Sequence, residues 1–207
     1  PQSAYDTLQA PLVDGAGTAF IANGTDSAAV RLDANGQVLW RASRGDIGID
    51  ASAALYDAQL APNGDLVLTH ADRVSRIDAT GRKRYSRIVA RPPAATSLID
   101  IVGFESGDGV VLQLLGNPQH APLARLALDG TELPPPVTAG VLSEPASVER
   151  VLLADGSVVA WAGGRSGARE LVRIGTDGNT IWRKVTPGTW NASVNGNAVG
   201  VLAARDG

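Results

Sequence analysis

Few residues of this chain could carry chemistry, and they are widely spaced. The two histidines, His70 and His120, lie fifty residues apart, and the chain contains no cysteine. A zinc site needs several nitrogen or sulfur ligands, and a Ser-His-Asp arrangement needs a histidine with defined partners. Neither kind of site is predicted. The lack of cysteine also excludes a disulfide framework and a cysteine nucleophile.

The acidic residues offer candidate acids and bases without an evident pairing. Asp57, Asp100 and Glu149 are candidates for an enzyme whose groups converge from separate parts of the chain. A second acidic set recurs in turns, where each turn supplies one or two oxygens, too few for a calcium loop. We attribute the second set to turn formation. Its members are Asp33, Asp78, Asp129 and Asp177.

Three residues in predicted loops are candidate binding residues. His120 ends the polar segment 116–120, Arg165 lies in the glycine-rich segment 163–167, and Trp190 lies outside any repeated aromatic position. The glycine-rich segment lacks the strand-to-helix context of a phosphate cradle. Residues 44–46 read Arg-Gly-Asp, an integrin-type tripeptide that is too short to indicate a function.

The elements that would position these residues belong to an internal repeat. The pattern Arg-[Leu/Ile]-x-x-x-Gly occurs four times, and its glycines are 45, 49 and 48 residues apart, as in propeller blades. Four residues after the glycine comes an aromatic residue in three copies, whereas the third copy has Pro134. The arginines are Arg31, Arg76, Arg125 and Arg173, and the aromatics are Trp40, Tyr85 and Trp182.

Each unit contains a second glycine turn, upstream of the first. One more turn of this kind marks the beginning of a fifth unit. Asp-Gly and Asn-Gly between short apolar runs favour two-residue type I′ hairpins. These dipeptides start at Asp14, Asn63, Asp108, Asp155 and Asn195. In the second unit we expect strands at 52–60, 65–70, 73–78 and 82–89, an antiparallel meander that is typical of a propeller blade.

These patterns predict an all-β fold, a β-propeller of four-stranded antiparallel blades forming one region over 1–207. The blades are expected at about 1–48, 49–91, 92–139 and 140–187, with a partial fifth at 188–207. The partial unit would leave an unpaired apolar strand at Val199–Ala204. We therefore expect the chain to be a fragment of a larger ring.

The repeated aromatic and arginine positions have a structural and a functional interpretation. The aromatics could stack against sugar rings, but their fixed place in the repeat favours packing between blades. The arginines could form an anion-binding ring. Their place before the turn favours stems that cover apolar surface and head groups that pair locally.

Composition excludes other classes of protein. The chain is 44% hydrophobic and 19% charged, so it can form a core. Its formal net charge is -3 and its basic residues are scattered, which argues against nucleic-acid binding. The longest apolar stretches, such as Gly109–Leu115, are far shorter than the ~20 residues of a transmembrane helix.

Two segments carry a family resemblance. Residues 32–40 and 174–182 resemble the outer-hairpin signature of the quinoprotein-like (pyrroloquinoline-quinone-type) β-propeller family, in which Leu-Asp-x-x-x-Gly-x-x-x-Trp recurs. The dehydrogenase branch of that family would imply adjacent cysteines over the cofactor and a calcium site. This chain has no cysteine and no recognisable calcium loop, so the resemblance favours the non-enzymatic scaffold branch, with no cofactor.

The resulting hypothesis is a non-enzymatic binding or scaffold module that holds a protein or carbohydrate partner through loops at the rim. Ala/Arg/Gly-rich composition suggests a bacterial source, and we expect an exported, extracytoplasmic protein. The alternative is the propeller portion of an exported enzyme, a hydrolase or a quinoprotein-like dehydrogenase, with its site in the central channel. An enzyme should gather carboxylates or histidine there, whereas a scaffold should expose an aromatic or apolar rim patch.

Overall fold

The computed structural model describes residues 11–14, 17–21, 27–50, 53, 55–70, 72–89, 99–105, 107, 109–114, 123–134, 150–153, 155–162, 170–175 and 179–185. Over these residues the fold is all-β and contains no helix. Accordingly, no helix in the described ranges is long and apolar enough to cross a bilayer.

The strands form four sheets, and each sheet pairs four consecutive strands in antiparallel order. The first sheet contains β1 (Leu12–Asp14), β2 (Gly17–Ile21), β3 (Ala29–Leu32) and β4 (Val38–Ala42). The second contains β5 (Leu55–Leu60), β6 (Leu66–His70), β7 (Arg73–Ile77) and β8 (Lys83–Ile88). The third contains β9 (Ile99–Phe104), β10 (Val110–Leu114), β11 (Leu123–Leu126) and β12 (Glu132–Leu133). The fourth contains β13 (Arg150–Leu152), β14 (Val158–Ala162), β15 (Glu170–Ile174) and β16 (Thr180–Val185).

The four strands predicted in the second unit are confirmed, with bounds that differ by at most three residues. The largest difference is at the start of β5, which begins at Leu55 and contains a register shift between Leu55 and Asp57. The repeat itself shows in the pairing, because Arg31 lies opposite Trp40, Arg76 opposite Tyr85, and Arg173 opposite Trp182. Strand periodicity and turn chemistry were therefore sufficient to find these elements.

The described turns at Asn63 and Asp155 are not the two-residue type I′ turns expected from their dipeptides. At 61–65 the N–H of Ala61 donates to the carbonyl of Asp65, and the N–H of Gly64 donates to the carbonyl of Ala61. This is the pattern of a three-residue loop in which a single glycine has positive φ, +81° at Gly64. The same bonding recurs at Gly36, Gly81, Gly130 and Gly156. One left-handed residue is enough to close each hairpin, which explains why only the glycine is constant.

The hydrophobic core lies between neighbouring sheets rather than inside one sheet. Strands β6 and β7 are buried on both faces: Leu66 and Leu68 pack toward the first sheet, while Val67 and Val74 pack toward the third. A smaller cluster, Val102 with Val111 and Val158, joins the third sheet to the fourth. Sheets stacked face to face in this way are the blades of a propeller.

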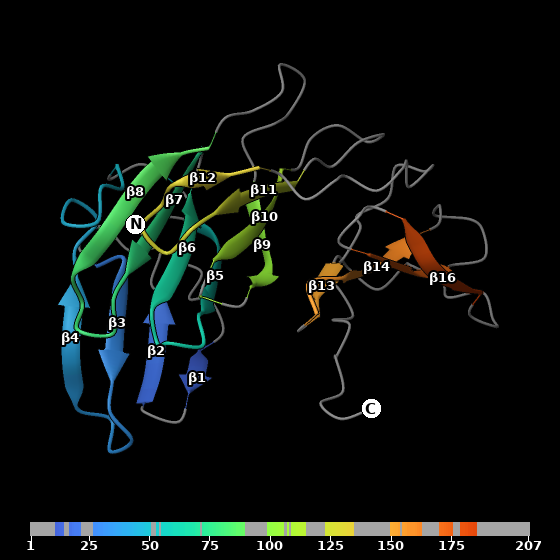
Figure 1. The fold of residues 1–207 in the computed structure, drawn as a ribbon. Helices are drawn as coiled ribbons and strands as arrows, with labels where there is room; N and C mark the ends of the chain where they lie inside the picture. Colours follow the sequence, from blue (N-terminus) through green and yellow to red (C-terminus); the bar gives the residue numbers. More distant parts are fainter. Residues whose placement is uncertain are drawn as a thin grey trace, which may run out of the picture.

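The first strands of successive sheets bring the blades together. β1 contacts β5, β5 contacts β9, and β9 contacts β13, so the inner edges of the four sheets are adjacent in chain order. Figure 1 shows the first three sheets as a packed group, with the β13–β16 sheet beside β9. Over the described residues the sheets do not close into a ring.

Candidate functional site

Each repeated arginine makes an ion pair inside its own unit. Arg31 pairs with Asp14 at 2.6 Å, Arg76 with Asp65 at 2.7 Å, Arg125 with Glu105 at 2.7 Å, and Arg173 with Asp155 at 2.5 Å. The acid comes from the first hairpin of the unit in every case. The predicted local pairing is confirmed. The guanidinium groups are engaged in holding two hairpins together, which argues against an anion-binding ring.

The pair in the second sheet is the most buried. Arg76 and Asp65 are exposed by 0% and 1% in their side chains, and Arg84 donates a further Nε hydrogen bond of 2.7 Å to the same Asp65 oxygen. Asn63 accepts from Arg76 Nη2 at 3.3 Å. A buried carboxylate between two guanidinium groups is stable because its charge is compensated. Removing the carboxylate, or removing the guanidinium groups, leaves the opposite charge buried without a partner.

Two aromatic residues dock onto glycine turns of the next sheet. Trp40 donates from Nε1 to the carbonyl of Ala79 at 3.1 Å, and a Cβ at Gly81 would lie 2.7 Å from its Cγ. Tyr85 covers Gly130 in the same way, at 2.7 Å from the position of an added Cβ. The prediction that repeated aromatics pack between blades is confirmed for these two, and neither presents a free ring face for a sugar.

Burial raises the pKa of the Tyr85 phenol, while the neighbouring Arg76 acts in the opposite direction. Tyr85 is therefore neutral over the physiological range. Its ring is 5% exposed and belongs to the core between the second and third sheets. The Tyr85 side chain is therefore part of the junction between the second and third sheets.

The candidate acid Asp57 is used to join two inner strands. Its Oδ2 accepts from the backbone N–H of Ile101 at 2.8 Å, and its Oδ1 accepts from the N–H of Ala58 at 2.7 Å. Gln59 donates from Nε2 to the carbonyl of Ile101, also at 2.8 Å. Together Asp57 and Gln59 bind both polar groups of one residue on β9. The arrangement explains Asp57 as a structural link between blades.

His70 forms a buried pair with a serine but cannot act on a substrate there. Its Nε2 lies 2.9 Å from Ser75 Oγ, which also lies 2.9 Å from Ser86 Oγ and 3.2 Å from the carbonyl of Ile47. Desolvation, then the charges of Arg73 and Arg44, lower the pKa of His70 to about 4, against the opposing charge of Asp50.

This pair is structural because neither member reaches solvent. His70 is 1% exposed and Ser75 is fully buried. A nucleophile must approach its substrate to within bonding contact, and its base must receive a proton from it. The neutral imidazole instead connects β6 and β7 to the segment that precedes β5.

The Arg-Gly-Asp tripeptide is a folded turn rather than an exposed recognition loop. Arg44 is 5% exposed and donates from Nη1 to the carbonyls of Asp50 and Ala53. Asp46 accepts from the hydroxyl of Ser43 at 2.6 Å. With its guanidinium buried against backbone carbonyls, the tripeptide cannot present the charge pair that an integrin would bind.

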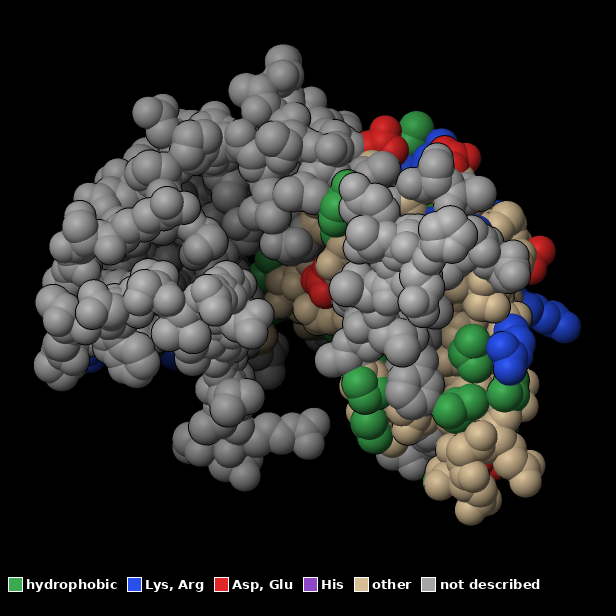
Figure 2. All heavy atoms as spheres, turned by 180° about the vertical axis from the view of Figure 1, so that it is seen from behind, with side chains coloured by type: hydrophobic (Ala, Val, Ile, Leu, Met, Phe, Trp, Pro, Cys, Tyr) green, Lys and Arg blue, Asp and Glu red, His purple; other side chains and the backbone are tan. Residues whose placement is uncertain are grey.

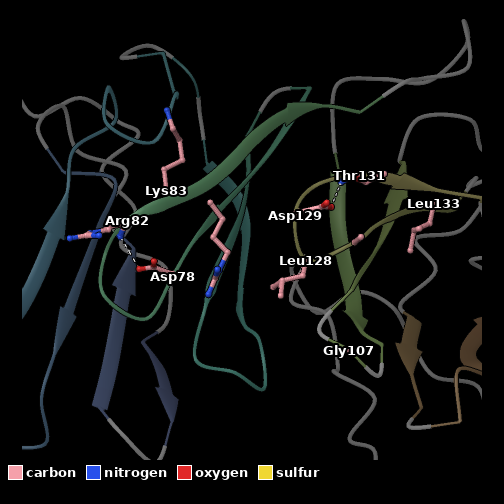
Figure 3. A pocket seen from close by; sticks show the side chains of 10 residues that line it. Asp78, Arg82, Lys83, Gly107, Leu128, Asp129, Thr131 and Leu133 are labelled. Carbon is pink, nitrogen blue, oxygen red and sulfur yellow. Dashed lines mark hydrogen bonds between the residues drawn. The ribbon is translucent and has the colours of Figure 1, made fainter.

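An open groove of about 860 Å³ lies between the outer hairpins of the second and third sheets. It is lined by residues of the β7–β8 hairpin, by Gly107 of the β9–β10 turn, and by the β11–β12 hairpin. Figure 3 shows Leu128 and Asp129 on the side of the β11–β12 turn that faces the hairpin carrying Asp78. Its full lining is Asp78, Arg82, Lys83, Arg84, Gly107, Ala127, Leu128, Asp129, Thr131 and Leu133.

Both groove carboxylates are held as anions by their own turns. Burial acts to raise the pKa of Asp78, but hydrogen bonds from Thr80 and Arg82 outweigh it and the pKa is lowered. The pKa of Asp129 is lowered chiefly by hydrogen bonds from Thr131. The Thr131 N–H donates to Asp129 Oδ1 at 2.8 Å.

The groove therefore combines fixed negative charge, cations and apolar side chains. Arg82 and Lys83 are exposed on its rim, while Leu128 and Leu133 are half-buried in its wall. A groove with charges of both signs and an apolar wall complements a peptide better than a uniformly charged polymer. Over the described part of the chain, no three acidic or histidine side chains gather in a way that could hold a metal.

The candidate residues taken from the sequence divide into three groups. Asp57 and His70 are described and are structural. Asp100 lies in β9, but its side chain is outside the described residues. The remaining candidates lie wholly outside the described residues, and stay predictions. They are His120, Glu149, Arg165 and Trp190.

Sequence reasoning missed the groove and most of the acids that bind the arginines. Asp65 and Glu105 stand 11 and 20 residues before their partners Arg76 and Arg125. The acid near the first turn of each unit could have indicated the partner of the arginine, but the number of residues between acid and arginine differs from copy to copy. The groove had no local signal, because three hairpins of two sheets form it.

Comparison with solved structures supports a propeller-type fold. A protein of unknown function from Bacteroides caccae has a TM-score of 0.54 at 12% identity, over 89% of this chain and 62% of its own. A prolyl endopeptidase has a TM-score of 0.55 at 15% identity, over 88% and 27%. BBS1N, solved in complex with ARL6DN, has a TM-score of 0.51 at 13% identity, over 83% and 50%.

This chain thus spans between about a quarter and two thirds of the length of the structures it matches. At such identities the likeness concerns the fold alone, which is all-β and propeller-like. No protein-family model matches the sequence. No curated protein matches it either.

Proposed function

We propose that this chain is a non-enzymatic, propeller-type binding module that holds an extended segment of a protein partner in the groove between its second and third sheets. The observation that carries the proposal is a contrast. The described residues that the sequence offered as candidate acid and base, Asp57 and His70 with its partner Ser75, are engaged in structural hydrogen bonds. The groove is open, and most of its lining residues are exposed.

A protein partner is favoured over a carbohydrate. Sugar-binding sites commonly use exposed aromatic faces, because such a face offers apolar area to the ring. Trp40 and Tyr85, on the outer strands of the first and second sheets, cover glycine turns instead. Leu128 and Leu133 offer an apolar wall, and Asp78 and Asp129 offer fixed acceptors for backbone amides.

The rest of the proposal concerns the setting of the module. We infer four blades and the start of a fifth as a portion of a larger ring, outside the cytoplasm of a bacterium. The support is the repeat at 195–196, the resemblance of 32–40 and 174–182 to quinoprotein-like propellers, and sheets that do not close into a ring over the described residues.

The test is selection of peptides from a displayed library on the purified chain, followed by affinity measurement with a groove variant. Leu128→Glu adds charge to the groove wall beside Asp129. Ile181→Glu makes the same change on β16, where Ile181 is 55% exposed and away from the groove. We expect Leu128→Glu to weaken peptide binding at least about tenfold, as for a residue at the centre of an interface, and Ile181→Glu to leave it unchanged.

Two results would contradict the proposal. One is a set of selected peptides whose affinity is the same for the wild type and Leu128→Glu. The other is binding on a glycan array with no peptide selected, which would favour a carbohydrate partner. Circular dichroism on each variant separates lost binding from lost folding.

A further inference from the structure

Strand β8 forms the outer edge of the second sheet. Both faces of this sheet are packed, one against the first sheet and the other against the third. β8 pairs with β7, and no described strand pairs with its other edge. It runs over six residues, Lys83–Ile88, whereas the outer strand of the third sheet has only two. A strand of six residues is long enough to pair with one more strand.

The pairing with β7 shows which backbone groups of β8 point to this edge. The N–H of Val89 donates to the carbonyl of Asp72 at 3.0 Å, one step beyond the pair of Ile88 with Arg73. Hydrogen-bonded and non-hydrogen-bonded pairs alternate along an antiparallel ladder, so the N–H and C=O groups of Ile88 and Ser86 point away from β7. Such groups are a template for a further strand.

The edge strand and the residue before it concentrate positive charge. Residues 82–88 contain four cations and no carboxylate, although the formal net charge of the chain is -3. One of these cations is bound to Asp65. The other three, Arg82, Lys83 and Arg87, are exposed, and their side chains form no ion pair or hydrogen bond with a residue in the described ranges. The edge therefore carries charge that this part of the chain does not neutralise.

The two faces of the edge differ in chemistry. Arg87 lies opposite Val74, which packs toward the third sheet, so its side chain is on that face. The pKa of Asp129 on the third sheet is lowered by hydrogen bonds from Thr131 and, less strongly, by the charge of Arg87, which agrees with this placement. Ile88 follows Arg87 and is on the opposite face, where it is 60% exposed.

These charges define which strand the edge accepts. Cations along an edge discourage pairing with other chains, including a second copy of the same strand. A strand that carries carboxylates is the exception, because opposite charges across a pair attract whereas like charges repel. If its side chains alternate, carboxylates lie beside Arg87 and apolar side chains lie beside Ile88. Alternation of acidic and apolar residues therefore matches both faces.

We propose that an acidic segment of the protein partner adds to the second sheet as a fifth strand along β8, with its carboxylates beside Arg87 and its apolar side chains beside Ile88. In recognition of this kind the main-chain hydrogen bonds supply affinity and the alternate side chains supply specificity. The inference rests on the proposed function, because Arg82 and Lys83 line the groove and lead directly into this edge. The segment held in the groove continues along β8.

The first test changes the peptide and leaves the full 207-residue chain unaltered. A fluorescent peptide of about eight residues that alternates aspartate and valine is titrated with the chain, beside a peptide that alternates lysine and valine. We expect the acidic peptide to bind at least about tenfold more tightly, and its binding to weaken at high salt. Equal binding of the two peptides overturns the proposal. Equally tight binding of a single-stranded DNA of the same charge also overturns it, because the edge would then bind polyanions in general.

Methylation of peptide nitrogens separates strand pairing from charge attraction. The peptide residues opposite Ile88 and Ser86 direct their N–H groups to β8, and in the expected register these residues are the valines. Methylating the valine nitrogens should weaken binding at least about tenfold, since several hydrogen bonds are lost. Methylating the aspartate nitrogens, which face away from β8, should leave binding nearly unchanged. Equal effects of the two methylations would rule out strand addition.

A pair of charge reversals tests the protein side. Arg87→Glu changes β8 at a residue outside the groove lining, and Arg41→Glu makes the same change at an exposed residue of β4. We expect Arg87→Glu to weaken the acidic peptide at least about fivefold and Arg41→Glu to leave it unchanged. Equal effects of the two changes contradict the proposal. Circular dichroism confirms that each variant is folded.

Leu128→Glu, measured with the same peptides, shows separately whether the groove binds. If Leu128→Glu weakens the library-selected peptides and Arg87→Glu affects neither these nor the acidic peptide, the proposed function holds and strand addition fails. If Arg87→Glu weakens the acidic peptide and Leu128→Glu has no effect on any peptide, β8 is the binding surface and the groove is not.

Discussion

The junction between the first and second sheets and the junction between the third and fourth are built from the same repeat but are held differently. In the first junction, Trp40 locks onto Gly81 and ten buried residues of the described chain form the core cluster. In the last, the repeated aromatic is replaced by Pro134. In Figure 1 the β13–β16 sheet lies beside β9, next to the packed first three sheets.

The difference shows what the repeat does in energetic terms. Arginine-acid pairs occur in all four units, so they do not distinguish one junction from another. The aromatic-glycine lock, in which an aromatic side chain packs on a glycine turn of the next sheet as Trp40 packs on Gly81, does distinguish them, because the third unit has Pro134 in place of the aromatic residue. The arginine-acid pairs hold the hairpins of one blade together, whereas the aromatics hold blades to each other. Arg31 does both, because its Nη1 also donates to the carbonyl of Gly64 in the second sheet at 2.9 Å.

The outermost strands of the sheets expose both apolar and charged side chains. Large apolar side chains are exposed on the outermost strands, among them Leu39 on β4 and Ile88 on β8. Figure 2 shows such side chains lying beside lysine and arginine on one face of the described part. Charged side chains on outer strands discourage pairing of these open edges with other chains.

The largest expected effect comes from breaking the buried ion network of the second sheet. Asp65→Ala leaves Arg76 fully buried without its carboxylate, and we expect a loss of about 3–5 kcal/mol in the free energy of unfolding. Asp155→Ala removes the equivalent acid of the fourth sheet, where the carboxylate is 54% exposed and water can solvate its partner.

Urea denaturation of the two variants and the wild type measures this contrast. Asp155→Ala should be close to the wild type. Equal losses of unfolding free energy in the two variants would show that burial does not strengthen the ion pair of the second sheet. The ion pairs of the second and fourth sheets would then contribute equally to stability.

The aromatic-glycine lock can be broken by a single methyl group. In Gly81→Ala the added Cβ would lie 2.7 Å from Trp40 Cγ, so the indole or the turn must move. We expect a loss of about 2–4 kcal/mol, part from the positive φ and the rest from the clash. Gly36→Ala has nearly the same φ and open space around the Cβ, so about 1 kcal/mol is expected.

Thermal unfolding of both glycine variants gives the contribution of the lock as a difference. The backbone strain is shared, so the excess loss in Gly81→Ala measures the contact with Trp40. If the two variants melt at the same temperature, Trp40 contributes nothing to the junction.

Acidification tests the His70 pair between the first two sheets. The pKa of His70 is lowered from 6.5 to about 4 in the folded chain, so the unfolded chain binds the extra proton first. Stability is fully present above pH 6.5 and falls as the pH drops toward 4, by about 3 kcal/mol at most. The lowered pKa values of Asp78 and Asp129 act below this window, because their ordinary value is 3.8.

His70→Gln should flatten the free energy of unfolding between pH 6.5 and 4, since glutamine can bond to Ser75 but does not titrate. The measurement is urea denaturation at several pH values for the variant and the wild type. An equally steep slope in the variant would assign the pH dependence to other groups.

The architecture could be predicted from the sequence because its signals are local. Glycine turns and alternating apolar runs found the four strands of the second unit, and a fixed spacing identified Trp40 and Tyr85 as packing residues. The turn type was wrong at Asn63 and Asp155, because the dipeptide does not show how many residues the loop contains. The hydrogen bonds at Gly64 reveal a third loop residue.

The site could not be predicted, because it depends on which segments become neighbours. Asp57 was a candidate acid until the structure placed the Ile101 N–H on its Oδ2, 44 residues away. Leu128 and Asp78 form the groove together, although they belong to different sheets. Neither contact leaves a pattern in the sequence, since a repeat fixes positions within a blade and not the gap between two blades.

The smallest expected effect isolates one hydrogen bond of the lock. Trp40→Phe keeps an aromatic ring over Gly81 but removes the Nε1 group that donates to the Ala79 carbonyl at 3.1 Å. Because Ala79 is exposed, water can replace the lost donor, and we expect a loss of only about 1 kcal/mol. Trp40→Ala, which also removes the ring from the core cluster, should lose about 3 kcal/mol or more. Urea denaturation of the pair therefore separates ring packing from the hydrogen bond, and equal losses in Trp40→Phe and Trp40→Ala would show that the hydrogen bond, rather than burial of the ring, holds these two blades together.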